Sequence, residues 1–130
     1  AGDAECAVVA EDEIALAMVN PRQYERGATL VIPKQHRETI LDISALEIAS
    51  IYTLAQRIAG ALEVAFGACG VNVFQNNGIK AGQHVPRVHV HVVPRFASSD
   101  SEKIFLQRNY PIVAMAELRH IAASIRATLQ

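Results

Sequence analysis

The sequence has few cysteines, almost no net charge and no long apolar run. Only Cys6 and Cys69 occur in 130 residues, which gives no sign of a disulfide framework and favours small, reduced, buried thiols. A formal net charge of −1 provides no broad basic surface for nucleic acid, so an anionic ligand would have to be bound locally. No apolar run approaches the roughly 20 residues of a membrane-spanning helix. We therefore expect neither a nucleic-acid nor a membrane partner.

The remaining composition is that of a folded protein. Hydrophobic residues make up 51% of the chain, and its length suits one domain over residues 1–130. The first residues, "AGDAECAVV", lack a basic head followed by an apolar stretch, so we expect no signal peptide and a cytoplasmic protein.

The order of the expected elements is three strands, a helix, two strands and a helix. Strands are predicted over residues 6–10, 14–19, 28–33, 71–75 and 87–94, and a last helix over 113–129. The first helix begins at a capping box formed by Ser44 and Glu47 and ends near Gly67, with Ile48 and Ile58 on its apolar stripe. Short connections favour antiparallel neighbours. The sequence therefore predicts an α+β fold, a five-stranded antiparallel sheet covered on one side by the long helix.

The last predicted strand, "RVHVHVVP", alternates between two kinds of side chain. Since successive side chains point to opposite faces of a strand, its first three valines should face the core. Arg87, His89 and His91 should share the other face. Two imidazoles and a guanidinium on one surface form either a solvated sheet face or a binding site.

Three interpretations of this face compete. Histidines exposed on an open sheet are common, and an isolated H-x-H favours that reading. A metal site needs a third and usually a fourth ligand, and Arg87 would repel a cation. A phosphate site suits the pattern better, because arginine binds phosphate oxygens and a neutral histidine can act as a nucleophile. The preceding turn adds Asn76 and Gln83, whose amides could approach an anion.

Three segments together resemble the histidine triad (HIT) family. "NNGIKAGQHVPRVHVHVVPR" resembles its signature, "LVIPKQH" its third strand, and "AMVNPRQYERG" its second strand and following loop. The likeness covers about residues 6–96. It implies a five-stranded antiparallel sheet with two helices, in a homodimer whose sheets join into ten strands. It also implies a nucleotide hydrolase or nucleotidyl transferase that acts at the α-phosphate of a purine nucleotide derivative, a phosphoramidate or a dinucleoside polyphosphate, without a cofactor or a metal.

The resemblance also implies roles for single residues. His89 matches the nucleophile, which would form a nucleotidyl-histidine intermediate, and His91 matches the last triad histidine, which binds phosphoryl oxygens and helps the leaving group depart. Gln83 matches a side chain that contacts the phosphate and the leaving-group bridge. Asn76 matches a turn asparagine near the phosphate, and Asn20 falls where the family hydrogen-bonds the ribose.

Two positions depart from the family pattern. Arg87 replaces the first triad histidine, and Ala28 stands where many members carry a further histidine that supports it. We hypothesise that Arg87 supplies a permanent charge, which either holds a phosphate or fills the space without supporting turnover. His84 either leans over the same phosphate or is simply exposed. Two alternatives remain open: a catalytically impaired nucleotide-sensing module with the same pocket and, more distantly, a metal-dependent hydrolase that uses both histidines. A zinc-binding C-x-x-C near the N-terminus, found in some bacterial members, is not matched by "CAVV".

Overall fold

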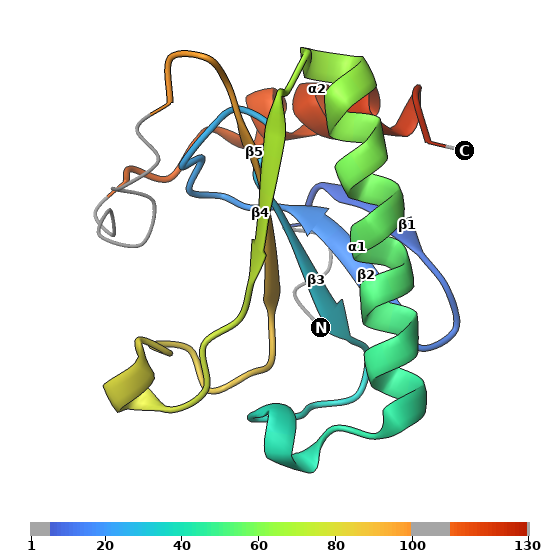
Figure 1. The fold of residues 1–130 in the computed structure, drawn as a ribbon, viewed down its shortest axis with the longest axis vertical. Helices are drawn as coiled ribbons and strands as arrows, with labels where there is room; N and C mark the ends of the chain where they lie inside the picture. The colour runs from blue at the N-terminus through green and yellow to red at the C-terminus, as the bar shows by residue number, and fades with distance from the viewer. Residues whose placement is uncertain (1–5, 100–109, 130) are drawn as a thin grey trace.

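The computed structural model describes residues 6–99 and 110–129, which form one sheet with two α-helices (Figure 1). The elements are β1 (Val8–Glu11), β2 (Ala15–Val19), β3 (Thr29–Pro33), η2 (Ile40–Asp42), α1 (Ala45–Phe66), β4 (Gly70–Phe74), η3 (Ile79–Ala81), β5 (Val90–Arg95) and α2 (Met115–Arg126), where η marks a 3-10 helix. Across these ranges, no helix combines the length and apolarity needed to cross a membrane. The predicted α+β architecture is confirmed.

The sheet has five antiparallel strands in the order β1-β2-β3-β5-β4. The histidine-bearing strand, β5, therefore lies inside the sheet, between β3 and the edge strand β4. Its register places His91 opposite Leu30 on β3 and opposite Phe74 on β4. Directly paired residues share a face of a sheet, so these three side chains lie on the same side.

Both helices cover the opposite face of the sheet. α1 packs on β2, β3 and β5, while α2 packs on β1, β2 and the side of α1. The core between them includes Val88, Val90 and Val92, as the alternation of the strand predicts, together with Ile58 and Ile121. The side that carries the histidines therefore faces away from the helices.

α1 begins at the predicted capping box. The Ser44 hydroxyl accepts the Glu47 backbone N–H at 3.0 Å, and the Ser44 backbone N–H donates to the Glu47 carboxylate at 2.9 Å. That second bond lowers the pKa of Glu47. At the other end Gly67 adopts φ +73°, a left-handed conformation that glycine takes without strain. The prediction for Ile48 is wrong, because its side chain is 37% exposed.

Replacing Ser44 by alanine is expected to lower the free energy of unfolding by about 1 kcal/mol, because one N-terminal N–H of α1 loses its acceptor. Urea unfolding of the two proteins measures the difference. The matched change Ser98→Ala, at an exposed serine, should stay within roughly 0.5 kcal/mol. Equal losses in both variants would show that the cap is not the cause.

β5 is shorter at its start than predicted. The predicted strand begins at residue 87, whereas the observed strand begins at Val90. The reason lies in the backbone bonds: Arg87 N–H donates to the Val85 carbonyl, and Val88 N–H donates to the Arg37 carbonyl, both at 2.7 Å. His89 therefore lies immediately before the ladder of the sheet.

Candidate active site

The ring of His89 is held by a main-chain oxygen. Its Nδ1 lies 2.8 Å from the Arg87 carbonyl oxygen. A carbonyl can only accept a hydrogen bond, so Nδ1 carries the proton. In the neutral ring, Nε2 is then left with a free lone pair, the form that a nucleophilic histidine requires.

The ring of His91 lies beside that of His89 and among aromatic side chains. The two imidazole centroids are 5.0 Å apart at an angle of 66°. Phe74 stacks on His91 with ring centroids 4.4 Å apart and ring planes 8° from parallel. The ring centroid of Tyr24 lies 6.0 Å from that of His91. His91 is only 8% exposed, and its Nδ1 has no hydrogen-bond partner among residues 6–99 and 110–129. The two imidazoles lie together, as expected, but His91 is packed among its neighbours rather than open.

Burial changes the protonation of His91. Desolvation, followed by the positive charge that His89 can carry, lowers the pKa of His91 from 6.5 to about 4. At neutral pH the ring is therefore uncharged. A neutral imidazole can accept a proton or donate one hydrogen bond, and it does not repel a positively charged neighbour.

The segment before α2 borders the same cluster. Tyr110 packs edge-on against Tyr24 with ring centroids 5.2 Å apart. The Arg22 guanidinium donates to the Tyr110 carbonyl, and Val113 N–H donates to the Pro21 carbonyl at 2.9 Å. The β2–β3 loop and the segment 110–113 are thereby joined next to the histidines.

Asn20 and Ala28 lie at the two ends of that loop. Asn20 is 6% exposed, its side-chain oxygen accepts the Arg22 backbone N–H at 3.0 Å, and its backbone N–H donates to the Ala28 carbonyl at 2.9 Å. Ala28 is fully buried and packs against Val93. This position therefore offers no side-chain hydrogen bond to the site.

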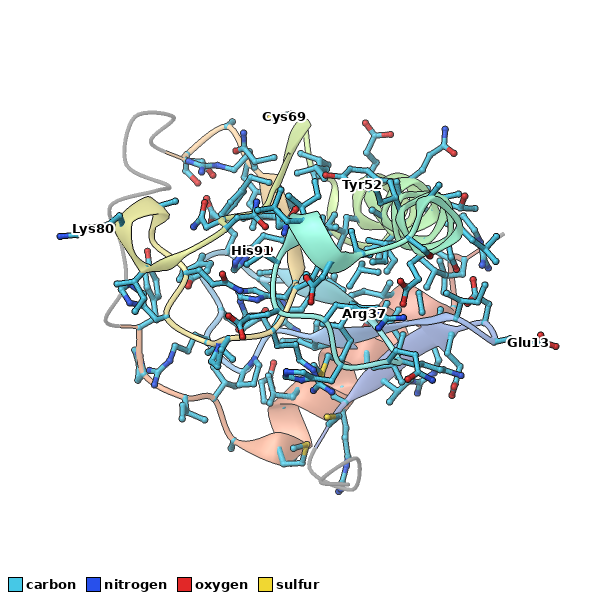
Figure 2. The ribbon with its side chains drawn as sticks, turned by 90° about the horizontal axis from the view of Figure 1, so that it is seen from below. Glu13, Arg37, Tyr52, Cys69, Lys80 and His91 are labelled. Carbon is cyan, nitrogen blue, oxygen red and sulfur yellow. The ribbon has the colours of Figure 1, made fainter. Side chains whose placement is uncertain are left out.

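The connection between β4 and β5 contains the remaining predicted residues. Asn76 is half-buried, His84 is exposed and Gln83 is 5% exposed. Figure 2 shows His91 well inside the outline of the molecule and Lys80, on η3, at the periphery and pointing outward. Gln83 is thus the most enclosed of these polar side chains.

Three hydrogen bonds fasten this connection to residues 37–40. They are Gln83 Nε2 to the Glu38 carbonyl, Ile40 N–H to the Asn77 side-chain oxygen, and Val88 N–H to the Arg37 carbonyl, each at 2.7 Å. Arg37 in turn contacts Glu47 of the capping box, with its Nε 3.1 Å from both carboxylate oxygens. The start of α1 is therefore linked to the chain that precedes His89.

Arg87, His89 and His91 are the basic side chains at the start of β5 and just before it. Arg87 is half-buried, and its Nε is buried without a hydrogen-bond partner in the described part of the chain. Within the same residues, no group of three His, Cys, Asp or Glu side chains is placed to hold a metal ion. The arrangement offers an imidazole whose Nε2 can act as a nucleophile, a second imidazole that is neutral, and a guanidinium able to bind an anion.

Sequence reasoning did not assign Tyr24, Tyr110 or Phe74 to this site. Only the register of β4 and β5 places Phe74 opposite His91. The tyrosines come from segments far apart in the chain, so no local pattern could have paired them.

Comparison with known proteins gives a consistent result. The profile of the HIT domain matches residues 1–98. Protein hit of Bacillus subtilis (strain 168) is 34% identical over 129 residues, which cover 99% of this chain and 89% of that protein. Adenosine 5'-monophosphoramidase hnt1 of Schizosaccharomyces pombe is 35% identical over 94 residues, covering 72% and 68%. The crystal structure of a Hit-like protein involved in cell-cycle regulation from Bartonella henselae superposes with a TM-score of 0.86 at 31% identity, covering 95% of this chain and 87% of that one.

Proposed function

Because the chain belongs to the HIT domain family, we propose that it is a nucleotide hydrolase or nucleotidyl transferase acting at the α-phosphate of a purine nucleotide derivative. The substrate class is a phosphoramidate or a dinucleoside polyphosphate. The similarity to a relative named as an adenosine 5'-monophosphoramidase supports the first of these.

The observation that carries the proposal is the hydrogen bond from His89 Nδ1 to the Arg87 carbonyl. Because this bond keeps the proton on Nδ1, the Nε2 atom of the neutral ring retains a free lone pair. The acceptor is a backbone group, so an arginine at this position preserves it as well as a histidine would. On the proposal that Arg87 replaces the first triad histidine, the ring of His89 therefore keeps its orientation.

The proposed reaction has two displacements. His89 Nε2 attacks the α-phosphorus, a P–N bond forms, and the leaving group departs with the electrons of its bond to phosphorus. Water then attacks the same phosphorus, the P–N bond breaks, and the nucleotide leaves. Splitting the reaction in this way replaces one difficult step by two easier ones. His91, adjacent and neutral, is proposed to bind phosphoryl oxygens and to help the leaving group take up a proton.

Binding roles are proposed for the surrounding polar residues. We propose that Asn20 binds the ribose hydroxyls and that Asn76 and His84 approach the phosphate. We further propose a cytoplasmic homodimer that joins its sheets at the edge strand β4, where Val73 is 41% exposed. Sedimentation equilibrium tests the dimer, and a monomer at micromolar concentration would contradict it.

A covalent trap tests the proposal. The protein is incubated with adenosine 5'-phosphoramidate or a dinucleoside polyphosphate, quenched in acid-free denaturant and analysed by intact mass. A nucleotidyl adduct that disappears as the substrate is used up supports the proposal. Tight nucleotide binding without adduct or product would instead support a nucleotide-sensing module, which the buried, non-polar Ala28 favours.

Arg87 is proposed to bind a substrate phosphate, because its buried Nε has no partner among the described residues. Arg87→Gln is expected to raise KM by roughly 10-fold, the loss of about 1.4 kcal/mol of charge-assisted hydrogen bonding, with a smaller change in kcat. Steady-state kinetics measure both constants. The control Arg119→Gln, at an exposed arginine on α2, should leave them unchanged. An unaltered KM in Arg87→Gln would remove the arginine from the binding site.

A further inference from the structure

The side chain of Gln83 is committed to contacts within the protein. Its Oε1 accepts the Gly78 backbone N–H at 2.7 Å, and its Nε2 donates to the Glu38 carbonyl at 2.7 Å and to the Arg87 carbonyl at 3.3 Å. An amide nitrogen carries two hydrogens, and both are used. Gln83 therefore has no donor left for a phosphate.

One of these contacts falls on the carbonyl that holds the nucleophile. The Arg87 oxygen accepts from Gln83 Nε2 and from His89 Nδ1, one bond for each of its two lone pairs. Gln83 and His89 are thus joined through a single main-chain oxygen.

The peptide unit between residues 87 and 88 is held at both ends. Its N–H, that of Val88, donates to the Arg37 carbonyl, and its carbonyl accepts from Gln83. This unit lies before the first residue of β5, so the ladder of the sheet does not fix its plane. The two lateral bonds fix it instead, and they aim the carbonyl at His89.

We propose that Gln83 is a positioning residue that keeps the proton of His89 on Nδ1 by orienting the Arg87 carbonyl. The inference rests on the proposed role of His89 as nucleophile. It differs from the role that the family resemblance implies for this glutamine, which is direct contact with the substrate phosphate.

Gln83→Glu is the sharpest test, because the side chain keeps its size and its acceptor for Gly78 but turns an oxygen toward two carbonyls. Long-range ¹H–¹⁵N spectra of the imidazole rings should show His89 moving from the Nδ1–H toward the Nε2–H form. In the same variant kcat should fall by roughly 30-fold, since a histidine with the wrong tautomer cannot attack, while KM changes less than about threefold. The matched control Gln56→Glu, at an exposed glutamine of α1, should change neither.

A second variant, Gln83→Met, has neither a charge nor a hydrogen-bond donor. It provides the test if Gln83→Glu misfolds or if its new glutamate is protonated. Both variants should shift the His89 tautomer in the same direction. A folded Gln83→Met protein in which His89 keeps its proton on Nδ1 would overturn the proposal. The spectra need no substrate, so they test this proposal even if the wild-type protein forms no nucleotidyl adduct. The lack of an adduct would overturn the proposed function instead.

Discussion

Replacing His89 by alanine is expected to lower kcat/KM by at least roughly 1,000-fold and to abolish the nucleotidyl adduct, because the proposed P–N bond forms on this ring. His91 cannot substitute for it, since its ring is 8% exposed and stacked on Phe74. Quenched intact-mass analysis and steady-state turnover measure the two effects on the same samples.

The matched change His120→Ala removes an exposed histidine from α2 and should leave both the adduct and the turnover at wild-type levels. Circular dichroism should show that His89→Ala folds, because His89 is half-buried and it is its neighbours Val88 and Val90 that belong to the core. An adduct that persists in His89→Ala would place the nucleophile elsewhere and would contradict the proposed reaction.

Stability is expected to fall steeply as the pH drops from 6.5 to 4, by up to about 3 kcal/mol from His91 alone. The folded pKa of His91, about 4, lies below the unfolded value of 6.5. Between these values the unfolded chain binds more protons than the folded one, so acidification favours unfolding. The contribution is complete above pH 6.5 and is lost as the pH falls toward 4.

Urea unfolding at several pH values measures this slope. His91→Gln keeps a polar side chain of similar reach but cannot be protonated, so its curve should be flatter than the wild-type curve over the same range. Subtracting the two curves removes the carboxylates that titrate in both proteins. Parallel curves would mean that His91 is more hydrated than its packing against Phe74 and Tyr24 indicates.

Local patterns in the sequence predict the elements of the fold well. The capping box of Ser44 and Glu47 and the glycine stop at Gly67 depend on neighbouring residues only, and each is found as predicted. The alternation of valine and histidine likewise places Val90 in the core and the two imidazoles together on the other face. A period of two residues needs no knowledge of the rest of the chain.

Contacts between distant segments are what the sequence could not supply. The start of β5 is displaced because Val88 bonds to Arg37, a residue that precedes α1. The stack of Phe74 on His91 follows from a strand register that no local pattern encodes. The roles assigned to Asn20, Asn76, His84 and Arg87 stay predictions that binding experiments must test.

The use of a main-chain oxygen to orient His89 has a consequence for how such proteins diversify. Every amino acid contributes the same carbonyl, so the side chain at position 87 is free to change toward new ligands while the ring of His89 stays aligned. A search for three alternating histidines would then pass over competent enzymes. A search for the last two histidines, together with a side chain that donates a hydrogen bond to the preceding peptide, would recover these enzymes.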